Sequence, residues 1–348
     1  MPACDADVLI VGGGIAGASA AYFAARAGRQ VTLVDAGLHR ASDLPLALVN
    51  PLRGRLGRLV RDGIEGARCT FALIGRLIAD GHRIAHGRGL WRPLIGAPES
   101  LCTRAFWEAL LPADFPFAWH DAAPASLGLV VTGPALWLAD AGWVAPLELL
   151  AAAIAASRAL VIVNEVIAIS STLARAHGDA THIATLADGN RITARTILWC
   201  GGAWGASRLV PTPGSARPED GNVLAYKPGA LVVTTTPLTD VPLTFGTYAA
   251  PNCSDTMKGT VLGPTREPAT QTFVLPTPRD EAIASLVQRA QRVFRETIAV
   301  RDVWHGVRLA HVPPTLSNAL NGTRAITALG SRGFLVAPLL ATLWARSL

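Results

Sequence analysis

The strongest constraint on the fold is a glycine cluster between two short apolar runs near the start of the chain. Residues 8–11 read VLIV, Gly12, Gly14 and Gly17 follow with the spacing G-x-G-x-x-G, and a second run, VTLV, ends at Asp35. Such runs are typical of buried parallel strands, and the alanine-rich stretch between them favours a helix. The pattern predicts a β-α-β unit with its glycine turn at the carboxyl edge of a parallel sheet.

Each glycine has its own role in such a unit. Gly12 allows the tight turn, Gly14 lets a pyrophosphate approach the backbone, and Gly17 lets the helix pack closely on the strand. Asp35 ends the second strand, where a carboxylate accepts both ribose hydroxyls of adenosine and repels a 2′-phosphate. The motif therefore predicts FAD or NAD and disfavours NADP. Gly28 is expected to end the helix as a left-handed cap.

The composition is that of a folded protein without a membrane span. Half of the 348 residues are hydrophobic and 16% are charged, which is enough for a large core. No run of about 18 apolar residues occurs, and the first residues lack the features of a signal peptide. The five cysteines are odd in number and never spaced C-x-x-C, which argues against disulfides or a metal site. We expect a cytoplasmic protein.

The positive charge of the chain is almost entirely arginine. The formal net charge is +6, and only two of the 31 basic residues are lysine. Because this bias is broad, it weakens an inference from charge to nucleic-acid binding. Arg55, Arg58 and Arg61 are three residues apart, which predicts that they share one face of a helix. That face would be solvated or would contact the FAD pyrophosphate or tRNA. The full cluster is Arg53, Arg55, Arg58, Arg61 and Arg68.

Two later segments favour a flavin over a nicotinamide. Residues 325–329 predict a strand, residues 330–333 a turn, and the following residues a helix to 345. A helix N-terminus offers N–H groups and partial positive charge, which suits a reduced flavin, whereas NAD needs no such partner. Residues 196–205, TILWCGGAWG, predict a strand that ends in glycines beside the cofactor.

In this order the segments resemble the D-amino-acid oxidase family of FAD-dependent oxidoreductases, which includes glycine and sarcosine oxidases. The segment GSRGFLVAPLLA is the most specific match, and LADAGWVAPLELLAAAI, VIVNEVIAI, TYAAPN with GTVLGPTRE, and HGVRLAHVPPTL are similar to other family segments. The sequence departs at Asn252, where many members have arginine, and at residues 311–314, where they have aspartate and proline. These departures concern the substrate more than the cofactor.

The resemblance implies an α/β fold with a Rossmann-like, doubly wound FAD-binding domain and a second, mostly antiparallel β substrate domain. We expect residues 1–80, 142–213 and 299–348 to form the first and residues 81–141 and 214–298 the second, with an amphipathic helix over 279–296 and a crossing at the proline-rich residues 210–221. The predicted FAD contacts are Gly12, Gly14, Ile15, Ala16, Gly17, Asp35, Ala36, Ser42, Val166, Cys200, Gly201, Gly202, Trp204, Gly330, Ser331, Arg332, Gly333 and Phe334.

For amine oxidation the protein must mainly orient the substrate, because the flavin breaks the bond. Arg308 is the candidate for holding a substrate carboxylate, since a guanidinium is a planar fork that matches two oxygens and the resemblance places the substrate arginine in this segment. Tyr248, and secondarily Tyr226, offer phenols to the substrate. His305 and His311 flank Arg308 and could take a proton from a substrate ammonium.

Three functions remain open at this point. The first is oxidation of the C–N bond of a small amine or amino acid by hydride transfer to FAD. The second follows from a resemblance to the flavin domain of the bifunctional enzymes that make 5-methylaminomethyl-2-thiouridine in tRNA, where an N-carboxymethyl group on the wobble uridine is removed oxidatively. The third is a flavin-binding subunit without turnover of its own.

Overall fold

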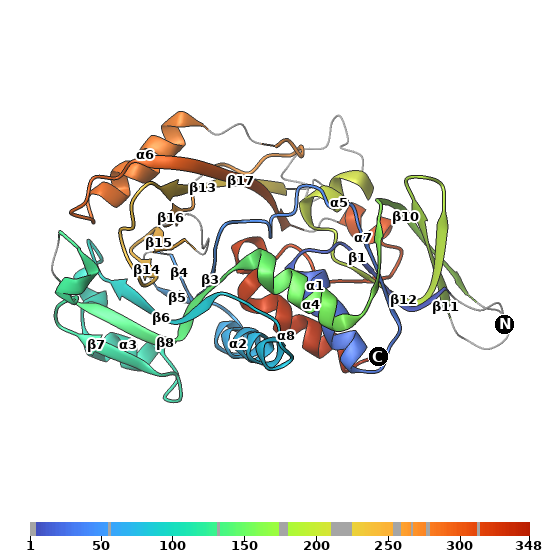
Figure 1. The fold of residues 1–348 in the computed structure, drawn as a ribbon, viewed down its shortest axis with the longest axis horizontal. Helices are drawn as coiled ribbons and strands as arrows, with labels where there is room; N and C mark the ends of the chain where they lie inside the picture. Colours follow the sequence, from blue (N-terminus) through green and yellow to red (C-terminus); the bar gives the residue numbers. More distant parts are fainter. Residues whose placement is uncertain are drawn as a thin grey trace.

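The computed structural model describes residues 5–54, 57–130, 133–173, 180–209, 225–252, 259–265, 267–275, 279–311 and 314–348. The described chain forms two large sheets and a group of helices against the first (Figure 1). A cavity lies between the two sheets. This mixed α/β arrangement confirms the predicted fold class. Among the helices described, none is both long and apolar enough to span a membrane.

Sheet A contains the predicted β-α-β unit. Strand β1 (Ala6–Val11) pairs in parallel with β2 (Val31–Asp35) and with β12 (Arg191–Trp199), and β2 pairs in parallel with β9 (Leu160–Val163). The strand order is β10-β11-β12-β1-β2-β9. The remaining strands are antiparallel β10 (Val166–Leu173) and β11 (Ala180–Leu186), and β18 (Arg324–Ala325) beside β12. The glycine turn thus lies at the carboxyl edge of parallel strands, as predicted.

One group of helices packs around α1 against sheet A. Figure 1 shows α1, α2, α4 and α8 grouped together beside this sheet. Their bounds are α1 (Ile15–Arg26), α2 (Gly63–Ala79), α4 (Pro146–Ser157) and α8 (Gly333–Ala345). Gly28 has a φ of +79° just after α1, which confirms the predicted left-handed cap. The small side chains of α1 let its neighbours approach closely, and residues from all four helices share one buried apolar core.

Sheet B is mostly antiparallel, in the order β17-β13-β16-β15-β14-β6-β8-β3, with β7 beside β8. Its strands are β3 (Ala47–Val49), β6 (His86–Pro93), β7 (Phe117–His120), β8 (Ala135–Val144), β13 (Ala225–Thr234), β14 (Leu243–Thr244), β15 (Tyr248–Pro251), β16 (Thr260–Gly263) and β17 (Val300–His311). Among the described strand pairs of sheet B, β14 and β6 alone are parallel. The other elements are hairpin strands β4 (Leu52–Arg53) and β5 (Arg58–Leu59), helices α3 (Arg104–Leu110), α5 (Gly202–Leu209), α6 (Asp280–Gln291) and α7 (Pro314–Ala319), and 3₁₀ turns Glu99–Leu101, Ala125–Leu127 and Gly330–Arg332.

The sheets do not change at the predicted domain boundaries. Strand β17 pairs along its length with β13 in sheet B, and it lies within residues 299–348, which we predict to belong to the cofactor domain. Strand β3 belongs to sheet B within residues 1–80, and β8 crosses the boundary at 141. The predicted strand over 325–329 is also shorter, because β18 ends at Ala325. The predicted crossing at residues 210–221 lies outside the described residues.

The arginine-rich segment does not form the predicted helix face. Arg53 and Arg58 pair across the β4–β5 hairpin, and α2 begins only at Gly63. Gly54 and Gly57 have φ values of +65° and +64°, which are left-handed conformations that break a helix. Arg55 lies outside the described residues.

Candidate cofactor and substrate site

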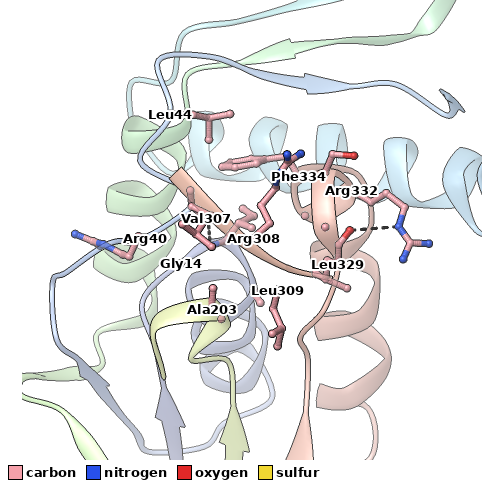
Figure 2. Close-up of a pocket in the computed structure, with 18 of the residues that line it drawn as sticks. Gly14, Arg40, Leu44, Ala203, Val307, Arg308, Leu309, Leu329, Arg332 and Phe334 are labelled. Carbon is pink, nitrogen blue, oxygen red and sulfur yellow. Dashed lines mark hydrogen bonds between the residues drawn. The ribbon is translucent and has the colours of Figure 1, made fainter. Parts of the chain in front are cut away.

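A cavity of about 530 Å³ lies where the two sheets meet. Residues at the carboxyl ends of β1, β2 and β12 line it from sheet A, and residues of β13, β15 and β17 line it from sheet B. The first turns of α1 and α8 complete its lining (Figure 2). Its volume is that of a ligand site, and its position at the carboxyl edge of parallel strands is where α/β folds bind ligands.

The glycine turn shows which glycines serve packing and which face the cavity. Gly12 has a φ of +100°, and a Cβ there would lie 2.6 Å from the carbonyl oxygen of Cys200. A Cβ on Gly17 would lie 1.8 Å from the carbonyl oxygen of Gly12. Gly17 does not line the cavity, whereas Gly12 and Gly14 do. Gly17 therefore acts through the fit of α1 against β1, in the packing role that the motif predicts.

Two side chains fix the N-terminus of α1 at the cavity. The backbone N–H of Ile15 donates to Ser42 Oγ at 3.1 Å, and the N–H of Gly13 donates to Asp35 Oδ1 at 3.0 Å. The other oxygen of Asp35 faces Arg40 Nη1 at 3.4 Å. Asp35 is thus held at the cavity edge, where the motif predicts the ribose acid.

The N-terminus of α8 lies directly beside that of α1. A Cβ on Gly333 would lie 3.2 Å from Ile15 Cγ2. Ahead of α8, Arg53 Nη2 donates to Ser331 Oγ at 3.3 Å, and Arg332 Nε donates to Leu329 O at 3.3 Å (Figure 2). Two helix N-termini, with their partial positive charge, therefore meet at one cavity.

The strand-to-glycine junction after β12 forms another side of the cavity. The N–H of Cys200 donates to Val11 O at 2.7 Å, which brings the junction against the glycine turn. Burial raises the pKa of the Cys200 thiol to about 12, so this cysteine is a neutral packing group rather than a nucleophile. The Trp204 ring packs edge to face with His39 and Phe273.

All the predicted FAD contacts except Gly17 line this single cavity. They come from segments more than 300 residues apart in the sequence. The lining contacts are Gly12, Gly14, Ile15, Ala16, Asp35, Ala36, Ser42, Val166, Cys200, Gly201, Gly202, Trp204, Gly330, Ser331, Arg332, Gly333 and Phe334.

Arg308 and Tyr248 line the sheet B side of the same cavity. Arg308 lies in β17 opposite Lys227 of β13, and its Nη2 donates to Pro228 O at 3.5 Å. Burial lowers the pKa of Arg308, Tyr248 raises it, Arg53 lowers it further, and the carboxylate of Glu267 raises it. The guanidinium stays charged because an arginine pKa starts far above neutral pH. Within the described chain, no carboxylate forms an ion pair with it.

The other substrate candidates are placed elsewhere. His305 does not line the cavity, and its buried Nδ1 has no hydrogen-bond partner among the described residues. Tyr226 is fully buried in an apolar cluster and does not line the cavity either. The backbone N–H of Asn252 donates to Gly259 O at 3.0 Å, and Asn252 does not line the cavity. The side chain of His311 lies outside the described residues.

Sequence reasoning missed Arg92, which lines the cavity from β6. Its side chain is buried, its guanidinium lies 5.7 Å from the centre of the Trp107 ring, and Nη2 donates to Gly54 O at 2.5 Å. Burial lowers its pKa to about 10, so it remains a cation at neutral pH. The only signal in the sequence was an arginine between apolar neighbours in LWRPL.

A family model described as FAD dependent oxidoreductase matches residues 7–347. The chain belongs to this family of FAD dependent oxidoreductases. Its cofactor is FAD, and the cavity fits it. The adenosine end would lie against Asp35, the pyrophosphate against Gly14 and the first turn of α1, and the flavin toward Gly330 and α8.

Solved structures of two oxidases share the fold of this chain. The glycine oxidase of Bacillus cereus superposes with a TM-score of 0.75 at 20% identity, covering 99% of this chain and 94% of that one. The iminodiacetate oxidase of Chelativorans gives a TM-score of 0.73 at 21% identity, covering 97% and 94%. The fold of nearly the whole chain thus has a counterpart in solved structures.

Two curated relatives are described as tRNA modification proteins. The tRNA 5-methylaminomethyl-2-thiouridine biosynthesis bifunctional protein of Delftia acidovorans is 29% identical over 93% of this chain and 55% of its own length. The protein of the same description from Ralstonia nicotianae is 32% identical over 61% of this chain and 33% of its own length. The chain therefore spans about half or less of these relatives.

Proposed function

We propose that this FAD dependent oxidoreductase oxidises the C–N bond of a small amine or amino acid that carries a carboxylate. The observation that carries the proposal is Arg308, a partly buried cation in the cavity of the cofactor site, without an ion-pair partner among the described residues. A guanidinium in that environment favours a planar anion. Glycine-like and sarcosine-like amines have a carboxylate one carbon from the nitrogen.

The chain's own residues orient the substrate. Arg308 would hold the carboxylate, and Tyr248, on the same sheet B side of the cavity, would bond the same group or close over it. Bound FAD would supply the two-electron acceptor for the hydride on the carbon beside the uncharged nitrogen, and the imine product would be hydrolysed by water. His305 lies outside the cavity lining, so we assign the loss of the ammonium proton to solvent before binding.

The test compares Arg308→Ala and Arg308→Lys with the wild-type protein. We expect both variants to keep stoichiometric FAD, because Arg308 lies on the sheet B side of the cavity. Anaerobic flavin bleaching by glycine, sarcosine, proline and D-amino acids should require Arg308. Removing its guanidinium should lower kcat/KM by a factor that corresponds to about 2–5 kcal/mol. Unchanged bleaching by a carboxylate substrate in Arg308→Ala would contradict the proposal. If no amine bleaches the wild-type flavin, a flavin-binding subunit without turnover is the better description.

The curated relatives favour a second candidate, in which the amine is an N-carboxymethyl group on a tRNA wobble uridine. The same arginine would hold the carboxylate of that group, which is an N-substituted glycine. The discriminating measurement is tRNA affinity as a function of salt, because phosphate contacts weaken steeply as salt is added. Salt-independent or absent binding, with turnover of free sarcosine, would leave only the first candidate.

A further inference from the structure

Three arginines from separate parts of the chain line the cavity near its sheet B side. Arg308 comes from β17, Arg53 from β4 and Arg92 from β6. Arg92 is only 3% exposed, whereas Arg53 lies at an exposed position. Arg53 is close enough to Arg308 for the two charges to repel. This end of the cavity therefore has more than the one cation that a single carboxylate needs.

Arg92 also holds in place the hairpin that carries Arg53. Its Nη2 donates to the carbonyl oxygen of Gly54, the residue after Arg53. Arg53 in turn donates to Ser331 at the start of α8. Arg53 is therefore restrained from two directions at the edge of the cavity, rather than extended freely into solvent.

The acidic residues of the cavity do not balance these cations. Among the described lining residues, the carboxylates are Asp35 and Glu165. Asp35 faces Arg40 at 3.4 Å, and Glu165 faces Arg208 at 3.0 Å. Asp35 ends β2 and Glu165 follows β9 of sheet A, at the adenosine end predicted by the glycine motif. Glu267 acts electrostatically on Arg308, but among the described residues it neither lines the cavity nor forms an ion pair with Arg308. The arginines near Arg308 therefore favour a ligand with negative charge, because like charges in a partly enclosed site repel strongly and an anion would offset that repulsion.

We infer that the amine oxidised at this site is a dicarboxylate, with one carboxylate on Arg308 and the second on Arg53, while Arg92 positions Arg53 through Gly54. The inference rests on the proposed function and narrows its substrate class. An N-(carboxymethyl) amino acid has this form, since its two carboxylates flank one nitrogen. Arg53 is then a specificity residue and Arg92 a positioning residue.

The experiment uses two substrates of nearly equal shape and different charge. Iminodiacetate has two carboxylates, and its monoamide, N-(carbamoylmethyl)glycine, has one. Anaerobic flavin reduction gives the ratio of their kcat/KM values for the holoenzyme, for Arg53→Gln, and for Arg61→Gln as the control. Arg61 is 93% exposed in its side chain and does not line the cavity.

We expect the wild-type protein and Arg61→Gln to prefer the diacid by about 10-fold or more, which is the effect of about 1.4 kcal/mol. Arg53→Gln should bring that ratio toward one, and Arg53→Lys should restore part of it. A wild-type ratio near one, equal losses for both substrates in Arg53→Gln, or weaker FAD binding in that variant would overturn the inference. Failure of every amine to reduce the wild-type flavin would instead defeat the proposed function.

Discussion

At the scale of single residues, Gly17 separates packing from ligand binding. It lies on α1, and a Cβ there would come within 1.8 Å of Gly12 O without reaching the cavity. Gly17→Ala should therefore displace α1 from β1 and lower the free energy of unfolding by about 3 kcal/mol. Denaturant unfolding measures the loss, and a variant as stable as wild type would refute this packing role.

Gly75 provides the matched control for that substitution. It lies at an exposed position inside α2, with no atom within 4 Å of an added Cβ. Gly75→Ala should raise the free energy of unfolding by about 0.5–1 kcal/mol, because alanine loses less backbone entropy in a helix. The same glycine-to-alanine substitution should thus change the free energy of unfolding in opposite directions at these two helical sites.

Tyr226 gives a pH-dependent prediction. Its ring is fully buried, its hydroxyl has no hydrogen-bond partner among the described residues, and burial raises its pKa to about 12. Because the unfolded phenol ionises near pH 10, the wild-type protein should lose stability as the pH rises from about 10 to 12. Tyr226→Phe should remove that contribution and stabilise by about 1 kcal/mol at neutral pH. Unfolding free energies at pH 7, 10 and 11 test both expectations, and an equal alkaline loss in the two proteins would contradict the first.

At the scale of elements, a proline in α8 explains a contact with α2. Pro338 has no N–H for the carbonyl oxygen of Phe334, four residues earlier in the helix. Thr70 Oγ1 of α2 donates to that oxygen at 2.9 Å, and Thr70 is fully buried. The hydroxyl thus replaces the missing helical bond and fixes α2 against the helix whose first turn lines the cavity.

A double-mutant cycle tests this replacement. Thr70→Val keeps the shape and leaves Phe334 O unsatisfied, which should cost about 1–3 kcal/mol of unfolding free energy. In a Pro338→Ala background the alanine N–H can bond Phe334 O, so Thr70→Val should cost about 1 kcal/mol less there. Equal costs in both backgrounds would show that the hydroxyl does not substitute for the helical N–H.

The sequence predicts individual helices and strands better than it predicts which strands pair with one another. The β-α-β unit and the helix that ends at Ala345 were readable because short-range glycines and apolar periodicity define them. The sequence does not show that β17 belongs to sheet B. Its partner β13 lies about 75 residues away in the chain, and alternation of apolar and polar residues does not identify a partner strand. The same limit applies to His305 and Arg308, since only the register shows which of them lines the cavity.

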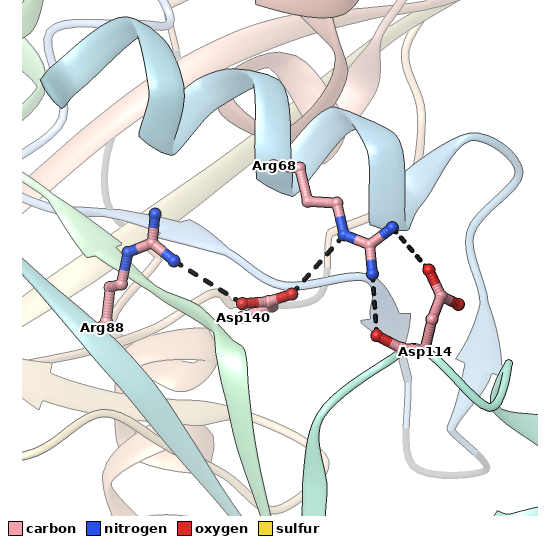
Figure 3. A network of polar contacts seen from close by, with 4 residues as sticks. All are labelled: Arg68, Arg88, Asp114 and Asp140. Carbon is pink, nitrogen blue, oxygen red and sulfur yellow. Dashed lines mark hydrogen bonds and ion pairs between the residues drawn. The ribbon is translucent and has the colours of Figure 1, made fainter. Parts of the chain in front are cut away.

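At the scale of the whole molecule, a charged network joins the helices to sheet B (Figure 3). Arg68 of α2 contacts Asp114 Oδ2 at 2.9 Å and Asp140 Oδ2 at 3.6 Å, and Arg88 of β6 contacts the other oxygen of Asp140 at 3.6 Å. Asp140 belongs to β8. The network therefore ties α2, which packs with the cofactor-side helices, to two strands of the opposite sheet, although these partly exposed pairs add little stability individually.

The cofactor should join the two sheets more strongly than this network does, because both sheets line its cavity. Removing FAD should therefore lower stability throughout the molecule. At a free FAD concentration of 100 times Kd the difference is about 2.7 kcal/mol, and the midpoint of thermal unfolding should rise with added FAD. Hydrogen exchange of apoprotein and holoprotein locates the effect. We expect FAD to protect amides of β1 and β12 in sheet A and of β13 and β17 in sheet B together. Protection confined to sheet A would show that the cofactor binds one sheet and that sheet B closes over it independently, which would also weaken the assignment of Arg308 to a substrate held against the flavin.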